Sequence, residues 1–142
     1  MVEPVSPGLS SRTHEQLRIL SIAHYVVGAL HALFACFGLI HFGMGVWMLI
    51  SPQSFSGRPE DMGIFIGVLF AVLGGIFVLG GWTLGIVTIL SGRYIAQRKK
   101  RTFSLIVGGI NCVFLPLGTV LGIFDLILLT RDDVRQEYDT AP

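Results

Sequence analysis

Three long apolar segments, residues 17–50, 62–95 and 103–129, make up most of this chain of 142 residues. A helix needs about 20 mostly apolar residues to cross a hydrocarbon layer about 30 Å thick, and each segment exceeds that length. Hydrophobic residues account for 52% of the chain and charged residues for 13%, whereas a soluble domain usually carries about 25% charge. The sequence therefore predicts an all-α fold, an integral membrane helical bundle.

Composition and capping signals divide the chain into three parts. Residues 1–12 are rich in proline, serine and glycine, and we expect them to form a flexible N-terminal tail. Thr13 and Gln16 fit a capping box, which predicts a helix start near residue 13. The transmembrane helical domain is expected at 13–130, followed by a polar C-terminal tail at 131–142.

Prolines interrupt the apolar pattern at two places. Residues 51–61 include Pro52 and Pro59 and are predicted to form a loop between the first two apolar segments. Pro116 breaks the third segment into pieces, the first of which is too short to cross a membrane alone. The third segment is then either one kinked helix that crosses the membrane or a hairpin of two helices that returns to the side from which it came; we favour the hairpin. The bundle is expected to hold three to four helices.

Half of the lysine and arginine residues lie at the end of the second apolar segment and in the loop that follows it. This basic group consists of Arg93, Arg98, Lys99, Lys100 and Arg101. The positive-inside rule makes this loop cytoplasmic, and the N-terminus, two spans earlier, lies on the same side. The group either sets the topology alone or also binds anionic lipid head groups. The net charge of only +1 gives no broad basic field, so the lipid bilayer, and not nucleic acid, is the expected partner.

Glycines recur at helical spacing in the second and third apolar segments. The pattern consists of Gly63, Gly67, Gly74, Gly81 and Gly85 in the second segment and of Gly118 and Gly122 in the third. Small residues allow two helix backbones to approach closely, which matters in lipid because the hydrophobic effect does not drive helices together there. These faces predict helix contacts, either within the subunit or between this chain and other membrane subunits.

Three histidines lie in the first apolar segment. His24 and His31 are seven residues apart and fall within about 20° of each other around a helix, whereas His41 lies on another side. A polar residue inside a membrane must face protein or water. Three interpretations are open: hydrogen bonding to another helix, proton handling, or ligation of haem or a metal. Paired axial histidines normally come from different helices, and the other apolar segments have none, so we expect no cofactor and no metal site.

Asp125 is the one acid within the third apolar segment. An intramembrane carboxylate is a candidate functional group, and its first requirement is a hydrogen-bond donor, for which His31 and His24 are the candidates. Asn111 and Thr119 add polarity to the same segment. Together these residues suggest a narrow polar track for protons or small ions.

One stretch of the sequence resembles a known group of proteins. Residues 101–138, RTFSLIVGGINCVFLPLGTVLGIFDLILLTRDDVRQEY, carry a Pro-x-Gly-Thr-x-x-Gly core at Pro116, Gly118, Thr119 and Gly122. This stretch, with the opening QLRILSIAHYVVGAL, resembles a group of small, uncharacterised, polytopic bacterial inner-membrane proteins. The resemblance implies a bacterial inner-membrane location and a body of three to four helices, and it assigns no catalytic residue.

The sequence specifies contact surfaces better than it specifies chemistry. We therefore expect a non-enzymatic membrane protein that acts through helix–helix assembly, either as an accessory subunit of a larger membrane complex or as a homo-oligomer. The alternative is a small ion or proton channel that uses His31 and Asp125.

Overall fold

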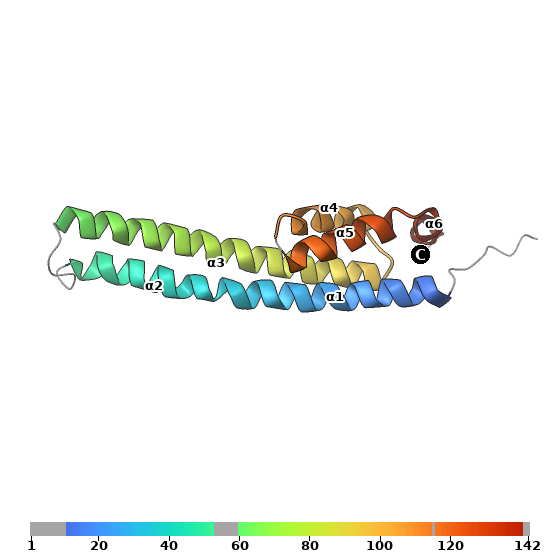
Figure 1. Ribbon diagram of the computed structural model, residues 1–142, viewed down its shortest axis with the longest axis horizontal. Coiled ribbons are helices and arrows are strands. Elements are labelled where there is room, and N and C mark those ends of the chain that lie inside the picture. The colour runs from blue at the N-terminus through green and yellow to red at the C-terminus, as the bar shows by residue number, and fades with distance from the viewer. Residues whose placement is uncertain (1–10, 53–59, 115, 141–142) are drawn as a thin grey trace, which may run out of the picture. The chain divides into compact units, whose positions relative to one another are not determined.

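A computed structural model describes residues 11–52, 60–114 and 116–140, and the regular secondary structure in these ranges is entirely helical (Figure 1). The helices are α1 (Ser11–Ala35), α2 (Phe37–Ile50), α3 (Glu60–Ala96), α4 (Arg101–Asn111), α5 (Leu117–Leu129) and α6 (Asp132–Thr140). The fold is therefore all-α, as predicted.

The helices group into two compact units. Unit 1 comprises Met1–Gly28 and Val87–Pro142, and unit 2 comprises Ala29–Ile86. α1 and α3 contribute residues to both units, because each helix runs through a boundary between them. α2 belongs to unit 2, and α4, α5 and α6 belong to unit 1.

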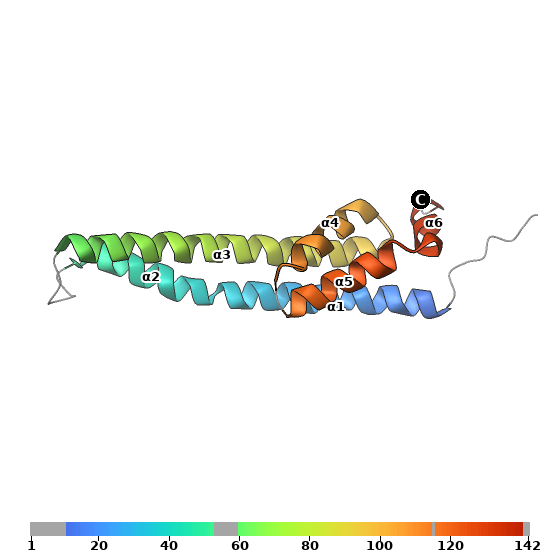
Figure 2. The same ribbon diagram turned by 45° about the horizontal axis from the view of Figure 1, so that its top comes forward.

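Unit 2 is an antiparallel helical hairpin in which α2 and α3 lie side by side (Figures 1 and 2). The two helices meet at glycines: Gly38 faces Gly74, and Gly45 faces Gly67. A Cβ atom added to Gly74 would lie only 2.5 Å from the backbone nitrogen of Phe42. Such a distance leaves no room for a side chain, so the backbones touch in the way that glycine alone permits.

Three other glycines of the predicted pattern also make close contacts inside the chain. Gly81 in unit 2, and Gly118 and Gly122 in unit 1, each lie so close to a neighbouring helix that an added Cβ would collide with it. Gly63 and Gly85 are buried. The sequence left two interpretations open, contact within the subunit or contact with other subunits. The close neighbours of Gly81, Gly118 and Gly122 lie within the subunit.

Unit 1 has a compact apolar core. The core consists of Leu17, Leu20, Val27, Ile95, Leu121, Leu128, Leu129 and Val134, from α1, α3, α5 and α6. α4 packs along α5 (Figure 1). Arg101 at the start of α4 donates from Nε to the carbonyl oxygen of Leu129, at 2.5 Å, and so satisfies one of the free carbonyls at the end of α5.

The third apolar segment forms a hairpin, as favoured, and not one kinked helix. α4 ends at Asn111, and α5 begins directly after Pro116, whose missing N–H costs little at a helix start. With 11 and 13 residues, α4 and α5 are about 16 Å and 20 Å long at 1.5 Å per residue. Each helix is therefore shorter than the hydrocarbon thickness of about 30 Å.

Three to four helices were predicted for the bundle. The described residues form six helical elements, of which α1 and α2 together make one apolar stretch, Arg12–Ile50, and α6 lies in the predicted tail. Cys36 divides the first apolar segment into α1 and α2, although its backbone angles stay helical (φ −62°, ψ −25°). Residues 132–140, predicted to be part of a polar tail, form α6. Asp132 and Asp133 stabilise the first turn of α6, because carboxylates complement the positive end of the helix dipole.

The first helix starts earlier than the capping pattern predicts. α1 begins at Ser11, so Thr13 lies inside the helix and is buried, with 2% of its surface exposed, and it is not the helix cap. Residues 1–10 and 53–59, which hold most of the predicted tail and of the predicted loop, lie outside the described residues.

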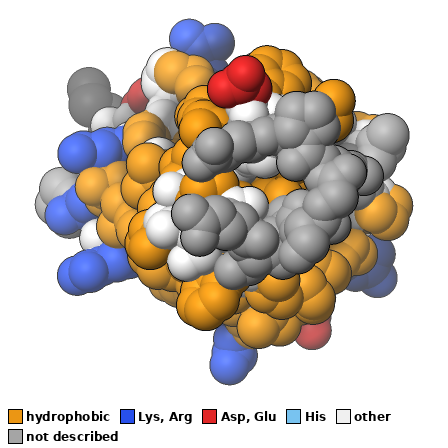
Figure 3. All heavy atoms as spheres, turned by 90° about the vertical axis from the view of Figure 1, so that its left-hand side faces the viewer, with side chains coloured by type: hydrophobic (Ala, Val, Ile, Leu, Met, Phe, Trp, Pro, Cys, Tyr) orange, Lys and Arg blue, Asp and Glu red, His pale blue; other side chains and the backbone are white. Residues whose placement is uncertain are grey.

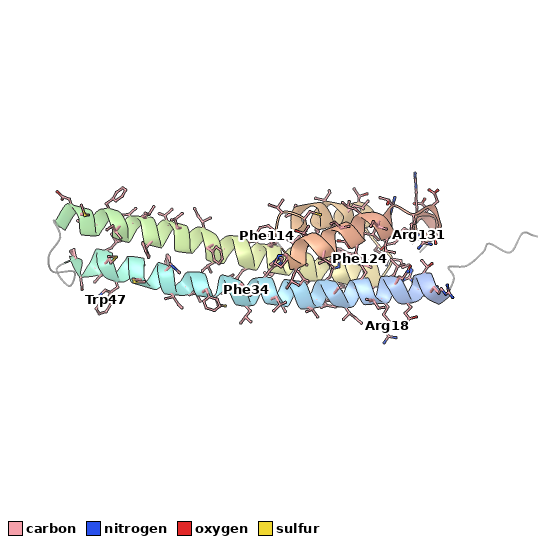
Figure 4. All side chains as sticks on the ribbon, in the orientation of Figure 1. Arg18, Phe34, Trp47, Phe114, Phe124 and Arg131 are labelled. Carbon is pink, nitrogen blue, oxygen red and sulfur yellow. The ribbon has the colours of Figure 1, made fainter. Side chains whose placement is uncertain are left out.

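Two helical stretches, Arg12–Ile50 and Asp61–Ala96, are long and apolar enough to cross a membrane. Only 22% of the apolar window in each stretch is buried. Phe34 and Trp47, for example, point away from α3 and are 56% and 61% exposed (Figure 4). Hydrophobic side chains also make up most of the described surface visible in Figure 3. A core helix of a soluble protein would bury such residues.

Candidate functional site

The candidate site is a histidine–aspartate pair inside unit 1. Nε2 of His24, on α1, lies 3.0 Å from Oδ2 of Asp125, on α5, and both side chains are fully buried. The sequence left His31 and His24 as the two candidate partners of this acid. The structure brings His24 to it.

The second ring nitrogen of His24 fixes where the protons lie. Nδ1 is 2.9 Å from the carbonyl oxygen of Leu20, one turn earlier on α1. A carbonyl oxygen only accepts hydrogen bonds, so Nδ1 carries a hydrogen and donates it. Nε2 then contacts Asp125 in one of two ways: it accepts from a protonated carboxyl group, or it donates to a carboxylate. Either way, this contact between two fully buried polar groups joins α1 to α5.

Two glycines make room for this pair. A Cβ atom on Gly92 of α3 would lie 2.7 Å from Cβ of His24, and one on Gly108 of α4 would lie 2.6 Å from Oδ2 of Asp125. Ser21, one turn before His24, donates from its hydroxyl to the carbonyl oxygen of Gly92 at 2.8 Å. α1 and α3 are thereby held together on one side of the pair, and α4 lies against Asp125.

A second polar pair joins α3 to α4. The hydroxyl of Thr88 and the side-chain amide of Asn111 exchange hydrogen bonds of 3.3 Å, and both residues are fully buried. Two further hydroxyls, those of Ser91 and Ser104, are fully buried as well. Among the described residues, no hydrogen-bond partner reaches either hydroxyl or Oδ1 of Asp125. The interior of unit 1 therefore combines paired polar groups with polar groups that have capacity left for a proton, a water molecule or an ion.

The remaining predicted polar residues lie elsewhere. His31 is half-buried in unit 2. His41 is exposed, and its ring stacks on that of Phe70, with the centroids 5.8 Å apart. Thr119 donates from its hydroxyl to the carbonyl oxygen of Cys112 at 2.9 Å, so it closes the turn between α4 and α5.

Sequence reasoning missed four buried hydroxyl residues of this site. They are Ser21, Thr88, Ser91 and Ser104. A signal was present in the spacing: Ser21 precedes His24 by three residues, and Thr88 precedes Ser91 by three, so each pair lies on one helix face. A serine or threonine hydroxyl can also bond to a carbonyl of its own helix one turn back, so its presence in an apolar segment does not by itself indicate a site.

Some members of the basic group, which runs from the last turn of α3 to the first residue of α4, contact other residues of the protein. Arg98 lies with Nη2 2.6 Å from Nδ1 of His14 on α1. Lys100 lies over the ring of Tyr94, with Nζ 4.9 Å from the centroid. Arg98 and Lys100 both have positive φ angles, 54° and 51°, which mark the tight turn that reverses the chain.

Arg93 and Lys99 of the basic group are exposed. Unlike Arg98, Lys100 and Arg101, they are not held by a contact described above. Arg93 lies in the last turn of α3, where a positive charge complements the helix dipole. These two residues are the members of the group most available to lipid head groups.

No protein family, curated protein or solved structure matches this chain. Within the described residues, no three histidine, cysteine, aspartate or glutamate side chains come together as a metal site would require.

Proposed function

We propose that the protein is a multi-pass integral membrane protein that performs no chemistry of its own and acts as an accessory subunit, assembling with copies of itself or with a larger membrane complex. The observation that carries this proposal is the apolar outer surface of unit 2. Its buried residues are few, mostly glycines at the contact between α2 and α3 together with Ala35, Met48 and Val78. Most of its large side chains face outward, where lipid or other helices can cover them.

The polar groups of unit 1 support a structural role for that unit. Thr88 pairs with Asn111, Ser21 with the backbone of Gly92, and His24 with Asp125. Interhelical hydrogen bonds of this kind stabilise helix packing in lipid. Unit 1 would then be the internally held part of the subunit, and unit 2 the part that meets neighbours.

We further propose a location in the bacterial inner membrane, with the N-terminus and the basic group in the cytoplasm. Two apolar stretches of sufficient length precede the α4–α5 hairpin; the exposed Arg93 lies in the last turn of the second stretch, and the exposed Lys99 follows it. α4 and α5 are each too short to cross. A hairpin that enters the membrane and returns would leave the C-terminus in the cytoplasm as well.

A photo-cross-linking experiment in native membranes tests the assembly proposal. A photoreactive amino acid at Phe65, which is 69% exposed on α3, should give discrete protein adducts. The same amino acid at Val78, which is 7% exposed on the same helix, is the matched control and should react only within the chain. Adducts to lipid alone from Phe65, together with a monomer on native gels, would rule out an accessory subunit.

The buried pair favours a second candidate, a small proton- or ion-conducting module. The alternative predicted from the sequence used His31 and Asp125, but His24 is the residue in contact with Asp125. Buried hydroxyls at Ser91 and Ser104 with unused capacity would extend a polar track. A proton flux into liposomes that is abolished by Asp125→Asn and kept by His31→Gln would favour this module over the accessory subunit.

A further inference from the structure

Unit 2 contains a shallow groove between α2 and α3 that the proposed function does not use. Its volume is about 350 Å³, within the range of small-ligand sites. The groove is lined chiefly by Phe37, Gly38 and His41 of α2 and by Phe70, Gly74 and Phe77 of α3. It is apolar except for one side chain, His41.

The glycine contact creates this groove. An added Cβ on Gly38 would lie 2.9 Å from Cγ2 of Val78 and 3.0 Å from the ring of Phe77. At Gly74 the backbones of the two helices touch, as described above. Because neither glycine has a side chain, the floor of the groove is backbone, and the phenylalanine rings that line the groove project beyond that floor.

His41 is oriented within the groove by two contacts. Nδ1 lies 3.3 Å from the carbonyl oxygen of Phe37, one turn earlier, so Nδ1 carries a hydrogen and donates it. The imidazole ring stacks on Phe70 with 24° between the ring planes. In the neutral ring Nε2 is then a hydrogen-bond acceptor. Among the described residues, no side chain or backbone N–H donates to it.

An unpaired hydrogen-bond acceptor in an apolar groove favours ligands that can donate a hydrogen bond to it. Within a membrane no water is present at depth to satisfy Nε2, so a ligand that donates one hydrogen bond gains most there. The phenylalanine rings favour a flat aromatic group by stacking. No lysine or arginine lines the groove, so nothing there favours a phosphate.

We propose that this groove binds an apolar molecule with a phenolic head group, such as a quinol or an alkylphenol, whose hydroxyl donates to Nε2 of His41. The ring lies among the phenylalanines, and the alkyl tail follows the exposed apolar faces of α2 and α3. The proposal rests on the membrane placement proposed above, and it requires that any assembly partner leave this groove open.

Two probes test the proposal, and they differ only in that a methyl group replaces the hydroxyl hydrogen in one of them. Equilibrium dialysis of the full-length protein in maltoside micelles against empty micelles measures the binding of 4-dodecylphenol and of its methyl ether, which cannot donate. We expect saturable binding of one phenol per chain, roughly fivefold tighter than binding of the ether, which is the ratio that one net hydrogen bond gives. Equal affinities, or no saturable binding of the phenol, would overturn the proposal.

Variants of His41 locate the site. His41→Phe keeps a ring stacked on Phe70 but removes the acceptor, so the preference for the phenol should disappear. His41→Gln restores an acceptor and should recover part of it. Phe65→Leu, at an exposed position of the same unit outside the groove, should leave the preference unchanged.

Two further outcomes would contradict the proposal. One is a phenol preference that survives His41→Phe in protein with the wild-type helical content and melting temperature, because the hydroxyl would then bind elsewhere. The other is a disulfide-linked dimer of Leu73→Cys, a position that also lines the groove, whose formation excess phenol added beforehand fails to prevent, because a second copy would then occupy the groove. Neither outcome changes the test of membrane insertion, which does not depend on His41.

Discussion

Units 1 and 2 hold their helices together in opposite ways. In unit 2, α2 and α3 touch through backbone at Gly38, Gly45, Gly67 and Gly74, with few buried side chains between them. In unit 1 the helices enclose an apolar core together with the buried pair of His24 and Asp125 and the other polar groups of α1, α3 and α4. Both α1 and α3 contribute to both units, so one helix serves both kinds of contact.

The contrast shows which interactions stabilise each unit. In the proposed membrane, burying more apolar side chains of unit 2 would bring little gain, and close backbone packing would be the remaining source of stability. Where polar groups are buried, leaving one of them unpaired is costly, so their pairings fix which helices meet. Unit 2 should therefore be sensitive to added volume, and unit 1 to lost hydrogen bonds.

The largest expected effect is the removal of Asp125. Asp125→Ala leaves Nε2 of His24 buried without a partner, and we expect it to lower the free energy of unfolding by about 3–5 kcal/mol. Asp125→Asn should cost about 1 kcal/mol or less, because the amide can donate to Nε2 while Nδ1 still donates to Leu20. Unfolding by SDS titration in mixed micelles measures both values. Equal losses for the two variants would show that the pair does not hold unit 1 together.

The second effect tests the glycine contact in unit 2. Gly74→Ala places a methyl group against the backbone of Phe42 and should cost about 3 kcal/mol, since backbone cannot move aside as a side chain can. Gly80→Ala is the matched control on the same helix, where an added Cβ meets nothing within 4 Å. It should be neutral or stabilise by up to about 1 kcal/mol through helix propensity. The same SDS titration compares them, and a harmless Gly74→Ala would remove the argument for close backbone contact.

These two sites also show which features of the fold can be predicted from the sequence. The apolar segments predicted the helices, Pro116 predicted the α4–α5 hairpin, and the heptad of Gly67, Gly74 and Gly81 predicted a helix contact. These features are local or periodic, so each can be recognised from a short stretch of sequence. The division at Cys36 was not predictable, because that residue keeps helical angles and carries no breaking signal.

The partner of Asp125 was open for a different reason. His24 and His31 lie within about 20° of each other on an ideal helix, so periodicity alone ranks them equally. The choice depends on how far along α1 the α5 helix packs, which is a property of the tertiary fold. Likewise, Thr88 and Asn111 lie on different helices, and nothing in the sequence near either residue points to the other.

The third effect concerns that Thr88–Asn111 pair. Thr88→Val keeps the shape of the side chain but leaves both polar atoms of the Asn111 amide unsatisfied, and we expect a loss of about 2 kcal/mol. Replacing both partners, as Thr88→Val with Asn111→Leu, should recover most of that loss because no buried polar group remains unpaired. Thermal unfolding in detergent, followed by circular dichroism, completes the double-mutant cycle. If the double variant is the least stable of the set, the bond is not the source of the effect.

The smallest effect is expected at the surface of unit 1. Arg131 and Asp133 form an ion pair of 2.9 Å, with their side chains 44% and 42% exposed. An exposed pair contributes about 0.5 kcal/mol or less, so Asp133→Asn should leave the thermal midpoint nearly unchanged. A loss as large as that of Thr88→Val would mean that α6 is held by this pair and not by the fully buried Val134.

The central claim is that the outward-facing side chains of unit 2 lie in the membrane, and cysteine accessibility tests it most directly. In a background in which Cys36 and Cys112 are replaced by alanine, single Val72→Cys, Phe34→Cys and Lys99→Cys variants are treated with a membrane-impermeant maleimide in intact cells and in inverted vesicles. We predict that Lys99→Cys reacts in inverted vesicles only. Val72→Cys and Phe34→Cys, although exposed in the fold, should react in neither preparation until SDS is added. Rapid labelling of Val72→Cys and Phe34→Cys in either preparation would contradict the account.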